Sequence, residues 1–317
     1  ADRYLRFREA MLKADPSIRL IACGGIGDCN GDWNHHVVAT CASKMQTITD
    51  HILNGIRVGA ETDPIELYHA FMGHSVVLAN GYAKLGEYMK AKGIPQPRIA
   101  VTECQLFPRW QGEAKPDGKL TPQTMIHPAT IAEAIYFTTI IHECIRLGDL
   151  IEMFTHSATV NHGGGLRKYR ERSFGNPVHY AHVMSAPLMN GTPVAVELSS
   201  AVYSTKKAFS NIPPLENVPA VDAMAVLSES GKELIVMLVH RAATTGAIQL
   251  SLDVKGFSAA NEAELLTLAD EVPYGANTYE QPEKIVPRQS GVRVVDGRVA
   301  LTLPAYSVSR LTIAAAP

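Results

Sequence analysis

The pattern of apolar residues changes near Gly191, and this change constrains the fold of the 317-residue chain more than any other feature. Before it, short apolar runs alternate with longer segments of helical spacing. After it, short runs of period two follow one another with only turns between them. Strands that alternate with helices predict a parallel sheet, whereas strands without helices predict an antiparallel sandwich. We therefore predict an α/β domain over residues 1–190 and a jelly-roll-like β-sandwich domain over residues 191–317.

The first part contains four β/α units, half of an eight-stranded (β/α)8 barrel, which typically needs about 250 residues. A polar loop with Asp32, Trp33 and His35 is expected after the first strand. The expected strands cover residues 18–23, 45–53, 99–102 and 150–154, and the expected helices cover residues 2–14, 64–92, 129–147 and 177–188. In the second part the expected strands cover residues 194–198, 221–227, 234–239, 248–254, 264–268, 292–295, 299–303 and 307–313.

Composition excludes several classes of protein. Apolar residues make up 46% and charged residues 19% of the chain, so a large core is expected and disorder is not. The net charge of −2, without a block of like charge, argues against nucleic acid or a membrane surface as a partner. Adjacent His35 and His36 lack a carboxylate at ligand spacing, and we expect neither a metal nor another cofactor.

The chain begins Ala1-Asp2-Arg3, without an initiator Met or a signal peptide, which is typical of a piece of something longer. The five cysteines are scattered, and free thiols favour a cytoplasmic location, with secretion left open. A bridge between Cys29 and either Cys23 or Cys41 also stays open.

One stretch predicts a catalytic group. Residues 99–102 form a short β-prone run that ends on the carboxylate of Glu103, and an aromatic loop containing Phe107 and Trp110 follows. In an α/β barrel the carboxyl ends of the strands carry the catalytic residues. A Glu in this position can equally cap a helix or pair with an Arg. The neighbouring Cys104 is a poor candidate for a thiol nucleophile, because the carboxylate of Glu103 opposes thiolate formation.

Two segments of the second part carry a resemblance to a known family. Residues 277–287, Asn-Thr-Tyr-Glu-Gln-Pro-Glu-Lys-Ile-Val-Pro, and residues 303–308, Leu-Pro-Ala-Tyr-Ser-Val, resemble the C-terminal sandwich of glycoside hydrolase family 51, mainly α-L-arabinofuranosidases. Residues 15–24 resemble the helix and fifth strand of the same family's barrel. The resemblance implies a retaining glycosidase in which Glu103, on the seventh strand, is the nucleophile. The acid/base Glu, on strand four, would then lie on a complementary chain or segment that carries barrel strands one to four. The family also implies a homo-oligomer.

The resemblance has departures. The family's Asp-Glu-Trp-Asn around the nucleophile is Thr-Glu-Cys-Gln here, at residues 102–105. On the sixth strand His51 is kept, but Leu53 stands where the family has the Tyr that holds the nucleophile. On the eighth strand Asn161 is kept, and the family's Gln is Ala158. These changes put arabinofuranosyl specificity in question, because some members of the family cut β-glucan or xylan.

Five residues are candidates for binding the sugar. His51 and Asn54 lie at the end of one expected strand, and Asn161 and His162 at the end of another; Trp33 could stack on a sugar ring. Each has a structural alternative: a satisfied core histidine, a turn residue or a loop anchor. We expect an oligosaccharide or polysaccharide substrate, with α-L-arabinofuranosides first. An endo-β-glucanase or xylanase, or a non-catalytic carbohydrate-binding homologue, is the alternative.

Overall fold

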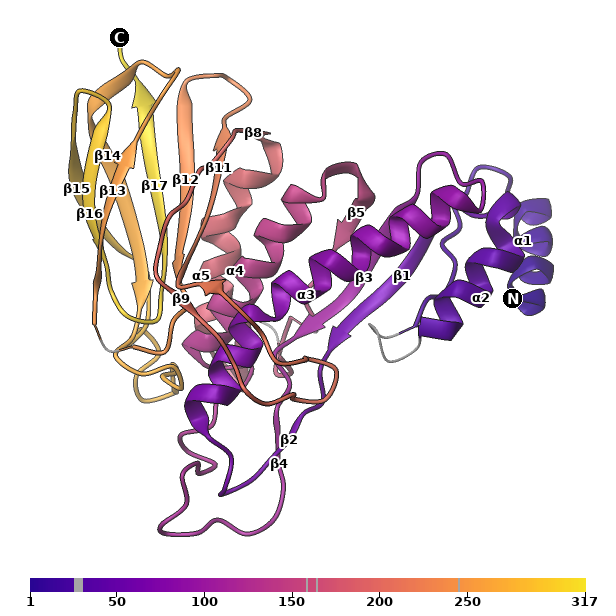
Figure 1. The fold of residues 1–317 in the computed structure, drawn as a ribbon, viewed down its shortest axis with the longest axis horizontal. Coiled ribbons are helices and arrows are strands. Elements are labelled where there is room, and N and C mark those ends of the chain that lie inside the picture. Colours follow the sequence, from indigo (N-terminus) through magenta and orange to yellow (C-terminus); the bar gives the residue numbers. More distant parts are fainter. Residues whose placement is uncertain (26–30, 158, 164, 245) are drawn as a thin grey trace.

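The computed structural model describes residues 1–25, 31–157, 159–163, 165–244 and 246–317. The chain runs from the helices α1 (Asp2–Ala14) and α2 (Gly31–Cys41), at one end of the long axis, to an all-β region at the other (Figure 1). The second half of a (β/α)8 barrel is followed by an antiparallel β-sandwich, as the sequence predicts. None of the helices among the described residues is both long and apolar enough to cross a membrane.

The barrel half is built on three parallel strands, β1 (Thr47–Leu53), β3 (Arg98–Gln105) and β5 (Ile151–Phe154), hydrogen-bonded in the order β1-β3-β5. Ala22 forms a parallel bridge to Ile48 on the free side of β1. The four expected strands are therefore adjacent in sequence order, as in a barrel. The expected strand over residues 18–23 is wrong in extent, because only Ala22 pairs with the sheet and the residues on either side of it do not.

Long helices cover this sheet on one side. Helix α3 (Pro64–Ala91) begins where the Asp63 carboxylate accepts hydrogen bonds from the amides of Ile65 and Glu66, and Pro64 occupies its first turn. Helix α4 (Ile131–Arg146) lies between β3 and the sandwich strands, so nearly all of its side chains are buried. That position explains its apolar sequence. Helix α5 (Pro177–Ser185) packs beside α4, and short 3₁₀ helices cover Ala42–Lys44, Gly148–Leu150 and Ala186–Asn190.

Helix α2 occupies the segment expected to be a loop. Its first residues, including Asp32 and Asn34, are typical of turns. Val37, Val38 and Cys41 are buried, however, and their burial favours a helix that local propensity does not. The prediction of a loop over residues 32–36 was wrong for this reason.

Short paired strands decorate the carboxyl ends of the parallel strands. β2 (Arg57–Val58) pairs in parallel with β4 (Arg109–Trp110), beyond the ends of β1 and β3 (Figure 1). β6 (Leu166–Tyr169) and β7 (Arg172–Gly175) form a hairpin after β5. β9 (Val202–Tyr203) and β10 (Val218–Pro219) pair in the segment that leads into the sandwich.

The second part forms one eight-stranded antiparallel sheet that folds over on itself, with the strand order β13-β16-β15-β14-β17-β12-β11-β8. β15 belongs to both layers, because Arg288–Arg293 pairs with β14 and Val294–Val295 pairs with β16. The strands are β8 (Thr192–Pro193), β11 (Val221–Leu227), β12 (Glu233–His240), β13 (Ile248–Asp253), β14 (Ala259–Ala269), β15 (Arg288–Val295), β16 (Arg298–Leu303) and β17 (Ser307–Ala315). The predicted strand over residues 194–198 is wrong: pairing stops at Pro193, and only the amide of Val194 continues it.

Burial patterns show which layer faces the barrel half. β16 alternates between buried and exposed residues, because only its inner face meets the sandwich core. β12 is buried at every position after Glu233: Leu234, Val236 and Leu238 point into the sandwich, and the intervening residues pack toward the helices. Strand β12 therefore reads as a continuous apolar run, as expected for a strand covered on both faces.

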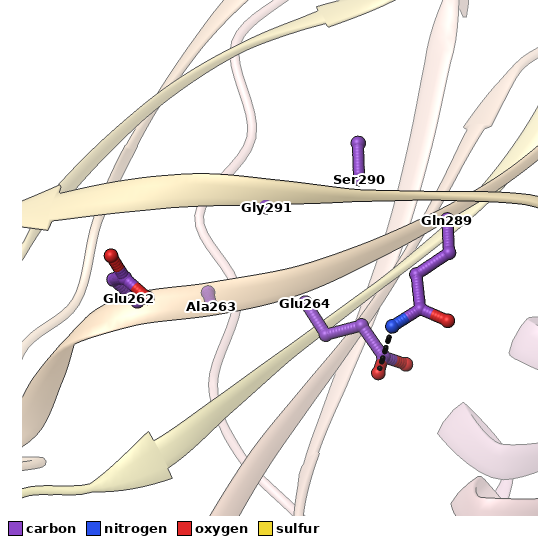
Figure 2. A pocket seen from close by; sticks show the side chains of 6 residues that line it. All are labelled: Glu262, Ala263, Glu264, Gln289, Ser290 and Gly291. Carbon is purple, nitrogen blue, oxygen red and sulfur yellow. Dashed lines mark hydrogen bonds between the residues drawn. The ribbon is translucent and has the colours of Figure 1, made fainter.

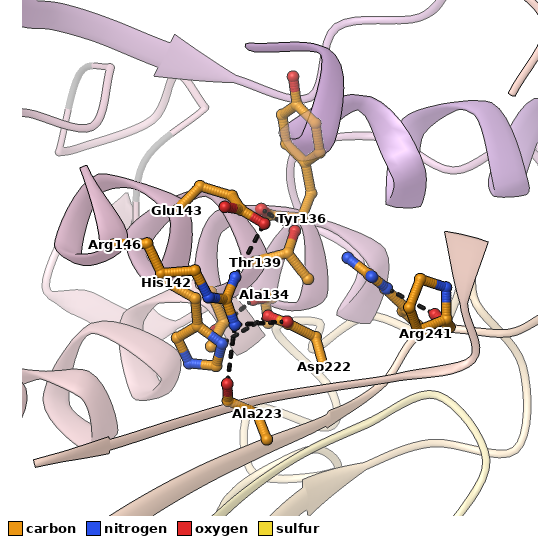
Figure 3. A network of polar contacts seen from close by, with 11 residues as sticks. Ala134, Tyr136, Thr139, His142, Glu143, Arg146, Asp222, Ala223 and Arg241 are labelled. Carbon is orange, nitrogen blue, oxygen red and sulfur yellow. Dashed lines mark hydrogen bonds and ion pairs between the residues drawn. The ribbon is translucent and has the colours of Figure 1, made fainter. Parts of the chain in front are cut away.

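A buried polar network joins α4 to β11 (Figure 3). His142 Nδ1 lies 2.6 Å from Asp222 Oδ2, and Arg146 Nη2 donates to Asp222 Oδ1 at 2.8 Å. Arg146 also donates to the carbonyl of Ala223 and to Glu143. This network fixes the sandwich against α4, the helix that follows β3.

Candidate active site

Glu103 lies near the carboxyl end of β3, directly opposite His51 on β1. The register between these strands shifts by one residue just before the pair, so that Asp50 faces Val101 and His51 faces Glu103. Glu103 and His51 keep side-chain exposures of 39% and 37%, whereas residues 99–101 of β3 and Asp50 of β1 are buried. A carboxylate and an imidazole are thus presented to solvent at the end where a barrel carries its catalytic groups.

Two side chains hold the Glu103 carboxylate from opposite oxygens. His51 Nδ1 lies 3.0 Å from Oε2, and the buried Ser157 hydroxyl donates to Oε1 at 3.0 Å. His51 comes from β1 and Ser157 from the segment after β5, so neighbours on both sides of β3 converge on one group. Each oxygen retains lone-pair capacity for a further contact. The carboxylate is oriented and accessible, as a nucleophile needs to be.

The segment after β5 is bonded to the end of β3. The amide of Ser157 donates to the carbonyl of Cys104 at 3.0 Å, and the Thr155 hydroxyl donates to the carbonyl of Thr102 at 2.7 Å. These contacts flank Glu103 on both sides along the strand. They fix the Ser157 hydroxyl relative to the carboxylate that it contacts.

A second carboxylate lies behind this segment, and it is fully enclosed. Glu133, on the first turn of α4, accepts the amide of Leu106 at 2.8 Å and faces His156 Nε2 at 2.6 Å. Burial raises the pKa of Glu133, and the hydrogen bond and charge of His156 oppose that rise. Because both its oxygens are occupied inside the protein, Glu133 is a support for the loops around Glu103 and not an acid open to substrate.

The thiol of Cys104 points away from this chemistry. It is buried, and burial raises its pKa well above the ordinary value, with the charge of Glu133 adding to the rise. A neutral, enclosed thiol is a poor nucleophile. Cys23, Cys41, Cys104 and Cys144 are free cysteines. The two bridges that the sequence leaves open both involve Cys29, which lies outside the described residues.

Asn54 is close to the site in sequence but is engaged in the core. It is buried, and its amide nitrogen lies 3.1 Å from the His74 ring, which in turn contacts the Tyr136 hydroxyl at 2.9 Å. Burial lowers the pKa of His74 to about 3, so that its ring is neutral at physiological pH. Asn54 thus links β1 to α3 and α4.

Asn161 and His162 follow β5, and the structure separates their roles. The Asn161 side chain accepts the amide of Lys168 at 2.7 Å and donates to its carbonyl at 2.8 Å, which fixes the segment after β5 to strand β6 of the hairpin. His162 Nδ1 lies 3.4 Å from Gln105 Nε2, two residues beyond Glu103, so His162 stands near the candidate nucleophile. Gly163 packs so closely on Gln105 that an added Cβ would overlap its amide.

Trp33 lies on the first turn of α2. Its indole Nε1 donates to the carbonyl of Cys23 at 3.1 Å, and the side chain is about half exposed. The indole ring is therefore partly open to solvent. It lies beside Cys23, the residue that follows Ala22 at the edge of the sheet. This arrangement suits both candidate roles, a loop anchor and a stacking surface.

Sequence reasoning missed Ser157, Glu133 and His156. A signal existed for the serine and the histidine, because both come just after a strand whose carboxyl end faces the same edge as Glu103. Glu133 gave no signal, since one carboxylate on an apolar helix usually faces solvent. Only the three-dimensional arrangement brings it under the end of β3.

One hollow of the surface lies away from this site. A shallow depression of about 580 Å³ covers the outer face of β14 and β15, lined by Glu262, Ala263, Glu264, Gln289, Ser290 and Gly291 (Figure 2). It exists because Gly291, paired with Glu264, has no side chain to fill the sheet surface. It contains none of the candidate site residues and no aromatic ring. Among the described residues, no group of three or more His, Cys, Asp or Glu could hold a metal ion.

Comparison with known proteins agrees with the fold described above. The family model described as the alpha-L-arabinofuranosidase C-terminal domain matches residues 108–307. The chain belongs to this family. The resemblance to glycoside hydrolase family 51 is thereby confirmed.

Relatives of this arabinofuranosidase-family chain cover nearly all of it. An intracellular exo-alpha-(1->5)-L-arabinofuranosidase of Halalkalibacterium halodurans is 21% identical over 94% of the chain and 59% of the relative. One of Streptomyces lividans is 22% identical over 94% of the chain and 45% of the relative. The chain therefore spans about half to three-fifths of the length of these curated relatives.

Solved structures show the same fold. The GH51 arabinofuranosidase from Xanthomonas axonopodis pv. citri superposes with a TM-score of 0.79 at 17% identity, covering 98% of this chain and 62% of that one. An alpha-L-arabinofuranosidase from Thermotoga maritima, solved with arabinose, gives a TM-score of 0.73 at 18% identity, covering 98% of this chain and 60% of that one. At these identities the likeness shows the fold alone.

Proposed function

We propose that this chain is the nucleophile-bearing part of a retaining glycoside hydrolase that releases α-L-arabinofuranosyl groups from plant-derived carbohydrates. The observation that carries the proposal is the accessible Glu103 carboxylate, held by His51 and Ser157 at the carboxyl end of β3. The curated relatives are named as exo-acting arabinofuranosidases, which supports this substrate class.

In a retaining mechanism, Glu103 attacks the anomeric carbon while an acid protonates the leaving oxygen. A glycosyl–enzyme ester forms. The carboxyl group that served as the acid then acts as a base and activates the water that hydrolyses this ester. His51 and Ser157 each contact one oxygen of the Glu103 carboxylate and hold the group in place for the attack. The carboxylate loses its negative charge as the ester forms, and both contacts accommodate that loss. The acid must stand about 5–5.5 Å from the nucleophile. Glu133 does not suit that role, because its oxygens are occupied by His156 and the amide of Leu106.

We assign the acid/base Glu to a segment outside this chain, carrying barrel strands one to four. In the described residues β5 pairs only with β3, and its other edge has no strand partner. Exposed edges of a parallel sheet are normally covered or closed. Strands supplied at this edge and beside Ala22 would close the barrel and bring the second carboxylate opposite Glu103. A stable, soluble monomer of residues 1–317 alone would contradict this assignment.

The departures from the family's sequence around Glu103 are compatible with catalytic turnover. Leu53 stands where the family's tyrosine holds the nucleophile, but Ser157 donates to the same carboxylate here. We propose that this serine takes over the positioning role. A non-catalytic carbohydrate-binding homologue would have no need for an exposed carboxylate with two dedicated partners.

The test is hydrolysis of a panel of 4-nitrophenyl glycosides by the longer protein that contains this chain. We expect the highest kcat/KM on the α-L-arabinofuranoside, with the anomeric configuration retained in the first-formed product. A preference for xylan or β-glucan oligomers would favour the endo-acting alternative. Binding of arabino-oligosaccharides without hydrolysis would favour the non-catalytic one.

A further inference from the structure

The β6–β7 hairpin carries an unusual set of side chains on one face. Directly opposed residues of an antiparallel pair share a face, and Arg167 pairs with Phe174 while Tyr169 pairs with Arg172. One face therefore presents two arginines and two aromatic rings. The tip residue Arg170 adds a third guanidinium, 5.3 Å above the Tyr169 ring.

The aromatic rings form a supported platform. Tyr279 packs against Phe174 with ring centroids 4.9 Å apart and against Tyr169 at 6.1 Å. Asn277 ties the Tyr279 segment to the hairpin by donating to the carbonyl of Gly175 at 2.8 Å, and it also accepts the amide of Ile285. Arg172 donates to the carbonyl of Tyr279. The platform is thus fixed from two segments, although the Tyr169 ring itself is 58% exposed.

Two arginines of this hairpin have no anionic partner among the described residues. Neither Arg167 nor Arg170 forms an ion pair or a side-chain hydrogen bond with any residue that the structure describes, and Lys168, on the opposite face, reaches only the carbonyl of Arg170. Residues 166–175 carry four cations and one carboxylate, that of Glu171, so the hairpin has a surplus of positive charge in a chain of net charge −2. Ordinary solvated faces mix both signs of charge, so the surplus calls for an anionic ligand.

The hairpin leads away from the candidate active site. Its base follows Gly163, which packs on Gln105, and the preceding segment contains the Ser157 that contacts Glu103. Tyr169 lies about 10 Å further along β6, at about 3.3 Å per residue. The loop that follows β3 reaches the base of the hairpin, because Thr130 forms a bridge to Ala276 and the neighbouring Asn277 donates to the carbonyl of Gly175 at the end of β7. The base of the hairpin therefore lies beside the rim formed by the end of β3.

We propose that this face binds a uronate sugar in the part of the carbohydrate beyond the bond that Glu103 cleaves, so that the preferred substrates are acidic, uronate-bearing polysaccharides. The inference rests on the proposed function for its place in the substrate. Tyr169 supplies a ring for stacking on the sugar. Arg170 and Arg167 supply the forked donors that match a carboxylate. A neutral arabinan has no group for either guanidinium.

The experiment is calorimetric titration of the longer protein in a Glu103→Ala background, so that binding is read without turnover. The probes are a galacturonate trimer and a neutral arabinofuranose trimer. We expect tighter binding of the galacturonate trimer, weakening as salt is raised. Arg170→Gln and Arg167→Gln should each weaken the galacturonate trimer about tenfold, the loss of one charge-assisted hydrogen bond, and leave the neutral trimer unaffected. Tyr169→Ala should weaken both.

Lys255→Gln is the matched control, because it removes an exposed cation from the sandwich and should change neither affinity. Equal affinity of the parent for the two trimers overturns the proposal, as does a loss in Lys255→Gln equal to that in the arginine variants. Melting curves establish that each variant is folded. Absence of arabinofuranoside hydrolysis would overturn the proposed function, whereas this binding result would stand, since it needs no turnover.

Discussion

Two carboxylate–histidine pairs of this protein have similar geometry and different surroundings. Glu103 and His51 lie 3.0 Å apart with more than a third of each side chain exposed, whereas Asp222 and His142 lie 2.6 Å apart with exposures of 6% and 0%. Asp222 is also bound by Arg146, so its oxygens are occupied from inside the protein (Figure 3). The chemistry of the groups is the same. The two pairs differ in that the Glu103 carboxylate is accessible to solvent and can accept further hydrogen bonds. These two properties distinguish the candidate site from the structural pair.

The comparison predicts opposite results for removing the two carboxylates. Glu103→Ala should lower kcat by several orders of magnitude with little loss of sugar binding, because the carboxylate acts mainly in the transition state. Azide or formate should partly restore turnover and give product of inverted configuration. The measurement is single-turnover kinetics with the longer protein, followed by labelling with a mechanism-based fluoro-sugar.

The control for this prediction is the position of the label. It should attach to Glu103 alone. A near-parental kcat in Glu103→Ala, or a label on Glu133, Glu143 or Glu152, would contradict the assignment of Glu103 as the nucleophile.

Asp222→Asn should instead act on stability. Breaking a buried pair leaves uncompensated charge and typically costs 3–5 kcal/mol in unfolding free energy. Activity per folded molecule should be unchanged, because the network lies between α4 and β11. Chemical denaturation measures the effect, and Asp253→Asn, which breaks the exposed pair with Arg298, should cost no more than about 1 kcal/mol. Equal losses in the two variants would remove the distinction between buried and exposed pairs.

The same pair predicts a pH dependence. Burial opposes ionisation of Asp222, but His142, followed by Arg241 and Arg146, lowers the pKa of this carboxyl well below its ordinary value. A lowered folded-state pKa contributes stability above the unfolded value, about 3.9, and that contribution is lost as pH falls toward the folded value. The difference in unfolding free energy between the parent and Asp222→Asn should therefore shrink below about pH 4. A difference that stays constant down to pH 2 would contradict it.

Ser157→Ala should have a smaller effect, on catalysis. It removes one hydrogen bond to the carboxylate of Glu103, a contact of the class whose loss costs about 1.5–3 kcal/mol. We expect kcat to fall by about ten- to a hundredfold while KM changes little, and Ser157→Thr to restore much of it. A fall in melting temperature with parental kcat would make Ser157 a packing residue only.

The sequence was informative where one physical signal dominated. Periodicity predicted the helix over residues 64–92, and a long apolar segment predicted the helix over residues 129–147. Short apolar runs between turns predicted β11 to β17, of which β16 alternates between buried and exposed residues while β11 and β12 are buried on both faces. It failed at α2, where tertiary packing of Val37 and Val38 overrides residues typical of turns. It also failed around residues 194–198, where alternating apolar residues continue beyond the last sheet hydrogen bond.

The candidate site divides in the same way. The position of Glu103 at a strand end, with His51 beside it, followed from the order of β/α units. Its support by Ser157, and the pair of Glu133 with His156 behind that, depended on which side chains meet when three strands and α4 pack together. Asn54 and Asn161 lie near strand ends and are predicted to bind the sugar; in the structure the Asn54 side chain contacts the His74 ring, and the Asn161 side chain accepts the amide of Lys168.

The smallest expected effect concerns Trp33. It tests whether an exposed aromatic side chain is functional, as solvent accessibility indicates for the Glu103 carboxylate. Trp33 is 50% exposed, and its indole Nε1 donates a hydrogen bond to the carbonyl of Cys23. Trp33→Ala should therefore raise KM a few-fold and shift the melting temperature only slightly, because exposed side chains usually contribute within about 0.5 kcal/mol. Trp110, the second tryptophan, is partly buried against the core and donates to the carbonyl of Gly112, so Trp110→Ala should lower the melting temperature more. A large fall in melting temperature for Trp33→Ala with an unchanged KM would show that Trp33 anchors its loop, and access alone would then not distinguish a sugar-binding ring from a packing one.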